Sequence, residues 1–136
     1  MSSEEVKVGD VMQTSLHMID GVASVQDAID EMRRLSVSSL VIERRHEGDE
    51  HGIVTVQDIA AQVVSLNRAA QRTSVYEVMT KPALTLGAAM HVKYAIRLLS
   101  RLGLGRALVT DGEGLRGFVT LRDLVLAYAD DADQVR

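Results

Sequence analysis

A seven-residue motif occurs twice in the chain, and this repetition restricts the fold more than any other feature of the sequence. The copies begin at Gly52 and Gly117, 65 residues apart, and read Gly-Ile-Val-Thr-Val-Gln-Asp and Gly-Phe-Val-Thr-Leu-Arg-Asp. In each copy an apolar run typical of a strand leads into polar residues typical of a helix start. A Val-Met pair comes ahead of each copy, at 11–12 and at 78–79. Since internal repeats indicate duplicated structural units, the sequence predicts two matched halves with a cleft between them.

Both halves show the same order of local patterns. Apolar residues recur at helical spacing from Val25 to Leu35, behind Ser24 and Asp27, which form a capping signature. Short runs rich in Val and Ile on either side of a polar, Gly-containing segment predict a hairpin. The expected elements of the first half are a strand over 14–19, a helix over 25–35, strands over 40–42 and 52–55, and a helix over 57–70. Those of the second half are a strand over 83–86, a helix over 91–102, strands over 106–110 and 115–120, and a helix over 122–129.

These patterns predict a mixed α/β fold of the α+β type, with the order β-α-β-β-α in each half. An all-helical alternative is disfavoured because the apolar runs at 40–42 and 53–56 are short and rich in Val and Ile. The two units are expected over 6–70 and 71–130, together forming one compact domain, with a short acidic tail over 131–136. A chain of 136 residues with 46% hydrophobic content can bury a core without disulfides.

Charge and hydropathy exclude several classes of partner. The formal net charge is −4, so the summed field repels a polyanion, and nucleic acid is not an expected partner. No segment has the length and apolarity of a signal peptide or a membrane-spanning helix, so no membrane partner is expected either. A cytoplasmic location is the default expectation.

The residues that carry chemistry form no catalytic pattern. There is no cysteine, which excludes disulfides, thiolate nucleophiles and zinc–thiolate sites. The four histidines, at 17, 46, 51 and 91, lack the spacing and the carboxylate partners of a metal site. No nucleophile elbow and no phosphate loop occurs. We therefore expect neither an enzyme, nor a metal, nor a catalytic cofactor.

Taken together, the repeated features closely resemble a cystathionine-β-synthase (CBS) domain pair, also called a Bateman module. The shared order is Val-Met, a short strand, an amphipathic helix, a strand, an acidic Gly-containing turn and then Gly-apolar-Val-Thr-x-x-Asp, twice over about residues 6–130. The resemblance implies two units that pack by their sheets around a pseudo-two-fold axis, with a cleft at each end. It also implies a homodimer and an adenine-containing ligand such as AMP, ADP, ATP, S-adenosylmethionine or a dinucleotide.

The same resemblance assigns ligand roles to the second copy of the motif. Asp123 would bind ribose hydroxyls, Thr120 and Arg122 would face phosphate, and Phe118 would form a wall of the base pocket. Leu84, Gly105 and Arg106 would complete this site. The chemistry is reasonable in itself, because an ionised carboxylate accepts from both hydroxyls of a cis-diol, whereas helix N-terminal amides and an arginine suit a phosphate.

The first copy offers a second possible ligand site. Its residues are Asp58, Thr55, Ile53, His17, Ser38 and Ser39. Gln57 and Ser39 stand where the second copy has Arg122 and Arg106, so the second site is the better phosphate site. A competing interpretation remains open for both copies, because Thr-x-x-Asp at a helix start is also a plain capping signature.

Two functions therefore remain. The leading hypothesis is a stand-alone regulatory module that senses an adenine nucleotide and signals in trans to an effector protein. The alternative is a ligand-free dimerisation or interaction module with vestigial clefts, since the family's usual prolines are replaced by Gly21, Val41, Ala88 and Leu108. In either case a homodimer is expected through the second helix of each unit, and an intramolecular face for the same residues is the open alternative. The apolar residues that suggest this interface are Ile59, Val63, Leu66, Leu124, Leu126 and Tyr128.

Overall fold

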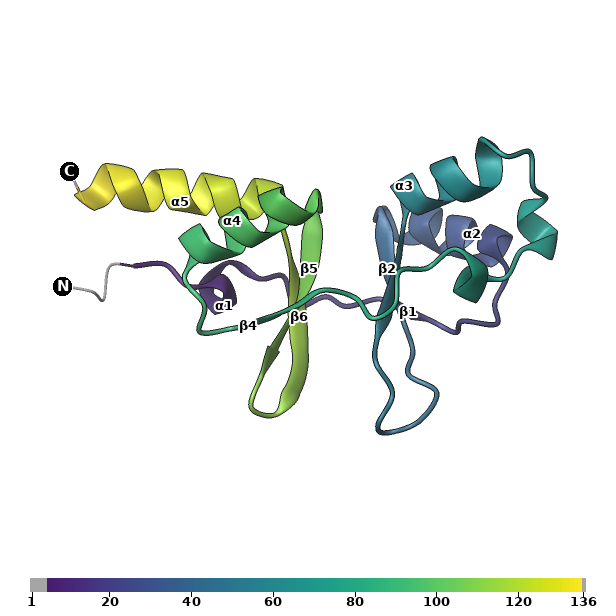
Figure 1. The fold of residues 1–136 in the computed structure, drawn as a ribbon, viewed down its shortest axis with the longest axis horizontal. Coiled ribbons are helices and arrows are strands. Elements are labelled where there is room, and N and C mark those ends of the chain that lie inside the picture. The colour runs from purple at the N-terminus through teal and green to yellow at the C-terminus, as the bar shows by residue number, and fades with distance from the viewer. Residues whose placement is uncertain (1–4, 136) are drawn as a thin grey trace. The chain divides into compact units, whose positions relative to one another are not determined.

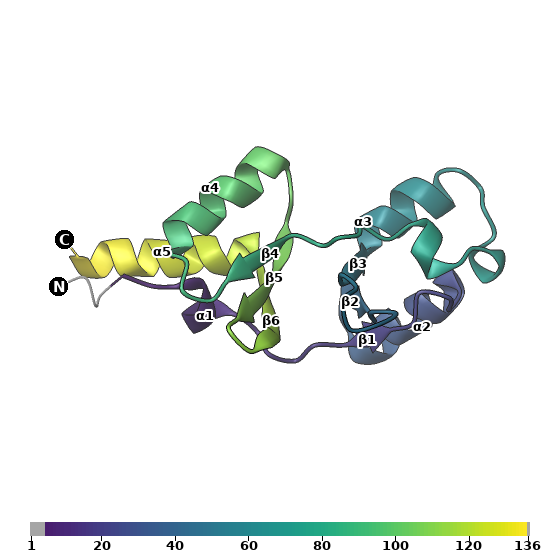
Figure 2. The same ribbon diagram turned by 60° about the horizontal axis from the view of Figure 1, so that its bottom comes forward.

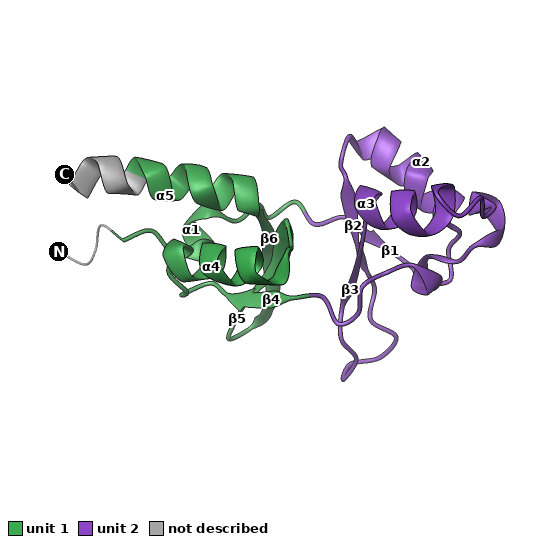
Figure 3. Ribbon diagram, turned by 45° about the horizontal axis from the view of Figure 1, so that its top comes forward, with its two compact units in different colours: residues 1–15, 84–136 green, residues 16–83 purple. Residues whose placement is uncertain are grey.

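The computed structural model describes residues 5–135 of the chain, with side chains over residues 5–130 (Figure 1). Helices and short strands alternate along the sequence, and each of the two three-stranded sheets packs against neighbouring helices. The predicted mixed α/β class, with two units of β-α-β-β-α order, is confirmed. In space the chain divides into unit 1, Met1–Ser15 with Leu84–Arg136, and unit 2, Leu16–Ala83 (Figure 3).

Unit 2 contains the first copy of the motif. Its elements are β1 (Met18–Ile19), α2 (Val25–Leu35), β2 (Ser39–Ile42), β3 (Gly52–Thr55) and α3 (Val56–Ile59), followed by a π-helical segment (Ala60–Val64) and 3-10 turns (Ala70–Arg72 and Val75–Glu77). In the sheet, β2 is central, parallel to β1 and antiparallel to β3. The core lies between this sheet and α2, where Val25 and Ala28 are fully buried with Val54.

Unit 1 repeats this plan around the second copy. Its elements are α1 (Val8–Val11), β4 (Thr85–Gly87), α4 (Val92–Leu102), β5 (Arg106–Asp111), β6 (Gly114–Thr120) and α5 (Leu121–Val135). Here β5 is central, parallel to β4 and antiparallel to β6. The helices α4 and α5 lie side by side (Figures 1 and 2), and Ala95, Leu99 and Leu124 are fully buried between helices and sheet.

Chain chemistry explains where the long helices begin and end. Ser24 Oγ accepts a hydrogen bond from Asp27 N at 3.0 Å, and Asp27 Oδ2 accepts one from Ser24 N at 3.2 Å, which completes the predicted capping box of α2. At the other end Ser36 has a φ of 57°, and Gly103 ends α4 with a φ of 68°. Left-handed residues at these positions stop a helix and turn the chain into the next strand.

Two of the predicted helices differ in length from expectation. The helix predicted over 57–70 ends at Val64, after a π-helical segment in which Ser65 N bonds Ala60 O. The chain turns away because Asn67 adopts a left-handed φ of 56°. The helix predicted over 122–129 continues to Val135 as α5, so the acidic tail expected over 131–136 begins within it. The side chains of that tail, and Arg136 altogether, lie outside the described residues.

Each Val-Met segment packs on the motif that belongs to the other repeat. Gln13, which follows Met12, exchanges two backbone hydrogen bonds with Phe118, of 2.8 and 2.9 Å. Thr80, which follows Met79, exchanges two of 2.9 Å with Ile53. The compact units therefore differ from the sequence repeats, since the N-terminal segment joins the second repeat in unit 1 and the Val-Met segment of the second repeat joins unit 2.

This close pairing accounts for the glycine at the head of each motif. A Cβ at Gly117 would clash with the carbonyl oxygen of Gln13 and would lie 3.3 Å from Met12 Sδ. A Cβ at Gly52 would lie 3.0 Å from Met79 Sδ and 3.2 Å from the carbonyl oxygen of Thr80. The glycine and the Val-Met pair are thus repeated together because they meet in space.

Candidate ligand sites at the two repeated motifs

Each motif forms a corner where a strand runs directly into a helix. In unit 1 the corner is tied to the start of β5, because Leu121 N donates to Gly105 O at 2.8 Å. In unit 2 Val56 N donates to Ser38 O at 3.0 Å in the equivalent place. The strand register sets Arg106 opposite Thr120 and Ser39 opposite Thr55. The corner thus brings each motif threonine close to the polar residue at the start of the central strand.

The apolar members of the predicted sites lie on the side of the sheet away from the unit's own core. Phe118 and Thr120 are half-buried and alternate with the fully buried Val119, as successive residues of a strand must. Ile53 and Thr55 alternate with the fully buried Val54 in the same way. The predicted base-wall residue and the predicted phosphate residue of each site therefore share one face.

The first strand of each sheet supplies the last predicted contact. Leu108 N donates to Leu84 O at 2.9 Å, and Val41 N donates to His17 O at 2.9 Å. These bonds place Leu84 and His17 next to the central strand, just ahead of β4 and β1. The structure thus puts each set of predicted residues in a single unit, and the corner bonds join their backbones directly.

The carboxylates of the two motifs have different partners. Asp58 Oδ2 accepts from Thr55 N at 2.9 Å, while Asp58 N donates to Thr55 Oγ1 at 3.1 Å, a complete capping box at the start of α3. Asp123 N donates to Thr120 Oγ1 at 3.1 Å, but Asp123 Oδ2 accepts from Gln13 Nε2 at 2.9 Å. The capping interpretation thus describes the Asp58 carboxylate, whereas the Asp123 carboxylate is bonded to a side chain from a distant segment.

Positive charge is concentrated at the second motif. Arg122 Nη1 lies 3.8 Å from Asp123 Oδ1, and the Arg122 side chain is 80% exposed. Arg106 is half-buried, and this burial lowers the pKa of its guanidinium, which still stays charged at neutral pH. Both arginines stand at positions where the first motif has neutral residues, Gln57 and Ser39.

Gln13 is the site residue that sequence reasoning missed. It comes directly after the Val-Met pair, and its counterpart in the other half is Thr80. The available signal was that each half repeats both the Val-Met pair and the motif glycine. Aligning the halves matches each Val-Met pair with the other Val-Met pair, and it does not show that a Val-Met segment packs on the motif of the other half. The structure pairs it with the other repeat, 110 residues away for Gln13 and Asp123.

Among residues 5–130, no group of three or more histidine and carboxylate side chains is placed to hold a metal ion. Within the part of the chain that the structure describes, every helix is too short or too polar to cross a membrane.

Comparison with known proteins identifies relatives of the whole repeat. The family model described as "CBS domain" matches residues 8–65 and again residues 75–130. An uncharacterised protein of Methanopyrus kandleri is 29% identical over 122 residues, which are 88% of this chain and 61% of that protein. The chain thus spans about 61% of the length of this curated relative.

Solved structures share the arrangement of elements. A hexameric CBS-CP12 protein from bloom-forming cyanobacteria superposes with a TM-score of 0.85 at 31% identity, over 90% of this chain and 71% of that chain. The CBS domain of a bacterial CNNM/CorC family Mg²⁺ transporter, solved in complex with ATP, gives a TM-score of 0.75 at 21% identity, over 94% of this chain and 90% of that one. The second likeness concerns the fold alone.

Proposed function

The chain belongs to the CBS domain family as a tandem CBS pair, a regulatory kind of module, and from this premise we propose that it senses an adenine nucleotide at its second motif. The observation that carries the proposal is the chemistry around Asp123. One carboxylate, held by Gln13, lies 3.8 Å from Arg122 Nη1 at the start of a long helix, and Arg106 lies opposite Thr120 in the strand register. This set combines an acceptor for sugar hydroxyls with donors for a phosphate.

In this proposal each residue has a separate task. Asp123 keeps acceptor capacity beyond its bond to Gln13, since a carboxylate has about four lone-pair sites, and it binds the ribose hydroxyls. Arg122, Thr120 and the first amides of α5 face the phosphates. Phe118 and Leu84 contact the base, with Gly105 and Arg106 at the facing corner. AMP, ADP and ATP are the leading ligands, and S-adenosylmethionine or a dinucleotide share the same adenosine group.

The first motif is proposed as the weaker site. Its Asp58 carboxylate is engaged in the capping box, and its corner carries no arginine. The remaining candidates, His17, Ser38, Ser39, Ile53 and Thr55, suit a neutral nucleoside-like group better than a phosphate. We expect it to be empty at concentrations that fill the second site.

We further propose that the output of the module is an interaction in trans, through a homodimer and an effector protein in the cytoplasm. Leu66, Leu126 and Tyr128, three of the residues expected at a dimer interface, are exposed, at 62%, 49% and 43%. The other three, Ile59, Val63 and Leu124, are buried in the cores of their own units, so they cannot form an interface. Val125 of α5 is exposed as well and extends the apolar surface of that helix.

The test is calorimetric titration of the whole chain with AMP, ADP, ATP, S-adenosylmethionine and NAD. We expect at least one of them to bind. Asp123→Asn should lower its affinity about tenfold or more, because a hydrogen bond to a charged group contributes about 1.5–3 kcal/mol. The matched control, Asp58→Asn, should leave the affinity nearly unchanged.

Two results would contradict the proposal in different ways. If Asp58→Asn weakens binding and Asp123→Asn does not, the ligand occupies the first motif. If none of the five compounds binds, the alternative function applies, a ligand-free dimerisation module, which light scattering would detect as a dimer of constant mass. The bond from Gln13 to Asp123 favours this alternative, since it satisfies part of the carboxylate without a ligand.

A further inference from the structure

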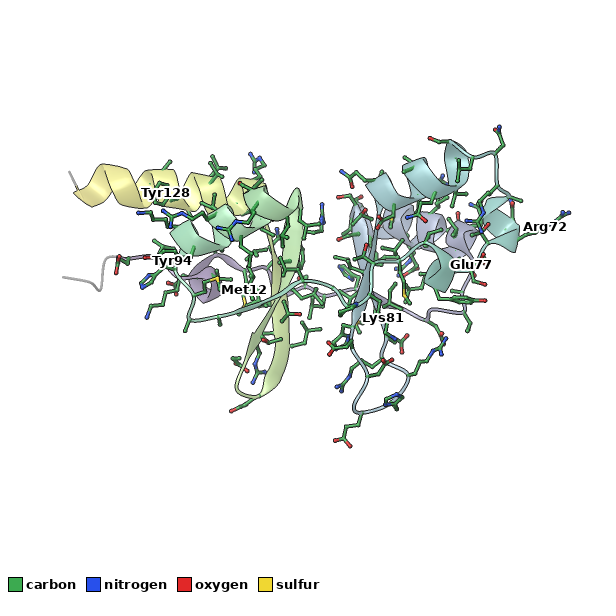
Figure 4. All side chains as sticks on the ribbon, in the orientation of Figure 1. Met12, Arg72, Glu77, Lys81, Tyr94 and Tyr128 are labelled. Atoms are coloured by element: carbon green, nitrogen blue, oxygen red, sulfur yellow. The ribbon has the colours of Figure 1, made fainter. Side chains whose placement is uncertain are left out.

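Unit 2 contains a pocket that the nucleotide proposal does not use. Its volume is about 260 Å³, and its walls are the chain following β1 at Asp20–Val22, the chain following β2 at Ile42–Arg45, and the segment that carries Tyr76, Met79 and Lys81. Lys81 is labelled in Figure 4. Since β1 and β2 are parallel, the pocket lies beyond their carboxyl ends, a common location for ligands in α/β structures. The motif corner of unit 2, with Ser38 and Ser39, lies at the opposite end of β2.

The size of the pocket limits the ligand. Its volume corresponds to about nine water molecules at roughly 30 Å³ each. It lies below the roughly 300–1,000 Å³ of pockets that enclose drug-sized molecules. A small metabolite of about nine non-hydrogen atoms therefore fits.

The charges of the lining have both signs. Lys81 Nζ is paired with Asp49 Oδ2 at 2.8 Å, and Asp20 Oδ1 accepts from Val22 N at 3.0 Å. Among residues 5–130, the side chains of Glu43 and Arg45 have neither a hydrogen bond nor an ion pair to another residue. Arg44, which also lines the pocket, donates to the carbonyl oxygen of Glu47 at 2.7 Å. The Glu43 carboxylate and the Arg45 guanidinium are thus the charged groups of the lining without a hydrogen bond among the described residues, which favours a molecule that carries an ammonium and a carboxylate at once.

The rest of the lining is apolar. Ile42 is 3% exposed and closes the inner wall, and Met79 is half-buried beside it. Tyr76 and Val22 are 47% and 69% exposed, although both border the pocket. Apolar side chains around a few polar groups are the usual composition of a small-molecule site.

Unit 1 provides an internal control for this set of residues. At the equivalent positions it has Gly87 for Asp20, Thr110 for Glu43, Gly112 for Arg45, Gly9 for Tyr76 and Thr14 for Lys81. The residues that build the fold, Met79 and Ile42, keep apolar counterparts, Met12 and Val109. A sheet of the same strand order forms in unit 1 without these charges, although its hairpin turn is shorter, so the sheet does not require them.

From size, charge and lining, we propose that this pocket binds a free α-amino acid with an apolar side chain. The ligand carboxylate pairs with Arg45, its ammonium pairs with Glu43, and its side chain lies against Ile42, Met79 and Tyr76. This site is separate from the motif sites, and the inference does not depend on the nucleotide proposal.

The experiment is calorimetric titration of the whole chain with leucine, methionine and phenylalanine. We expect at least one to bind with one site per chain, and two matched analogues to bind about tenfold more weakly or not at all. For leucine these are 3-methylbutylamine, which lacks the carboxylate, and 4-methylpentanoate, which lacks the ammonium. Amide NMR spectra should shift at Val22, Arg45 and Tyr76 on addition of the amino acid.

Variants assign the binding to the pocket. Arg45→Gln and Glu43→Gln should each lower the affinity for the amino acid about tenfold, as expected for the loss of a charge-assisted hydrogen bond. The double variant Glu43→Thr with Arg45→Gly puts the unit 1 residues into unit 2 and should abolish binding while the protein still folds. Arg33→Gln on α2, whose side chain is 76% exposed, is the matched control and should change nothing. Asp123→Asn should also leave this affinity unchanged.

Three outcomes would overturn the inference. The first is that none of the three amino acids binds at millimolar concentration. The second is that 4-methylpentanoate or inorganic phosphate binds as tightly as leucine, which would make the pocket a simple anion site. The third is that binding survives the Glu43 and Arg45 variants or is lost in Asp123→Asn.

Discussion

The two copies of the motif form the same corner of strand and helix, but their carboxylates differ in what they bond. Asp58 closes a capping box on its own helix, whereas Asp123 bonds Gln13, which a distant part of the chain brings to it. Three of the residues that make this difference, Gln13, Arg106 and Arg122, stand where the other half has Thr80, Ser39 and Gln57. The corner is thus the same in both copies, while substitutions around it give the second copy two arginines and a different partner for its carboxylate.

The largest effect is expected at the glycines that admit the Val-Met segments. Gly117→Ala should lower the free energy of unfolding by about 3 kcal/mol, because the new Cβ collides with the backbone of Gln13, which is held by two hydrogen bonds. Gly52→Ala should lower it by about 1–2 kcal/mol, because its nearest neighbour is the flexible Met79 side chain. Urea unfolding measures both.

Gly87→Ala is the control for these two variants. No atom lies within 4 Å of the position of its Cβ, so stability should change by less than about 0.5 kcal/mol. Equal losses at Gly52 and Gly117 would show that the two exchanged segments contribute alike and that the backbone clash is relieved.

The next-largest effect on stability is expected to differ between the aspartates of the two hairpins. Asp49 pairs with Lys81, at 14% and 25% exposure of the side chains, whereas Asp111 pairs with Arg116, at 39% and 40%. Lys81 and the Arg45 amide hold the pKa of Asp49 far below its usual range, and the Glu113 amide and Arg116 lower that of Asp111. Because exposed pairs contribute little, Asp49→Asn should reduce the melting temperature at pH 7 more than Asp111→Asn does.

The same pair gives a pH dependence with a defined sign. A carboxyl whose pKa is lower in the folded state stabilises the fold fully above its unfolded pKa, about 3.9 for aspartate, and loses this contribution as the pH falls below that value. Melting curves of the parent chain should therefore decline below about pH 4, and the decline should be shallower in Asp49→Asn. An unchanged slope would show that Asp49 does not govern acid stability.

A smaller effect tests the capping boxes. Thr55→Ala removes the hydroxyl that caps α3 and should cost about 1 kcal/mol of stability. Thr120→Ala removes the equivalent bond from Asp123 N and should cost about as much stability, but it should also lower the affinity for the nucleotide. A nucleotide affinity that is unchanged in Thr120→Ala would limit the threonine to capping.

The change in stability at Gln13 is expected to be smaller than at the capping threonines. Gln13→Ala removes one exposed hydrogen bond and should cost less than about 1 kcal/mol. Thr80→Ala is its counterpart in the other half. Only the Gln13 variant should alter nucleotide affinity in titration, and equal behaviour of the two variants would remove Gln13 from the proposed site.

Much of the fold follows from local sequence patterns, and the failures have a common cause. The amphipathic stripe and the Ser24 cap located α2 at its observed bounds, and the Val-rich runs located both hairpins. The early end of the helix predicted over 57–70 was missed because it depends on one left-handed residue, Asn67. The pairing of each Val-Met segment with the motif of the other repeat was missed, because periodicity indicates local structure and does not indicate which distant segment a strand pairs with.

The candidate sites show the same limit. The motif pattern grouped Thr120, Arg122 and Asp123, which are neighbours in sequence, and the family resemblance added Arg106, which the strand register sets opposite Thr120. The partner of the Asp123 carboxylate could not be found from spacing, because no pattern links residues 13 and 123. The charged pocket beyond β1 and β2 was also missed, since its residues come from three separate segments that individually resemble polar loops.

The pairing of each Val-Met segment with the motif of the other repeat also sets the order in which the two units can fold during translation. Unit 2 is one continuous stretch, so it can fold on the ribosome as soon as residue 83 has emerged. Unit 1 needs Gln13 beside Phe118, and Gln13 must therefore wait without its partner until the last third of the chain is translated. The half proposed to sense the nucleotide is thus the half that matures last.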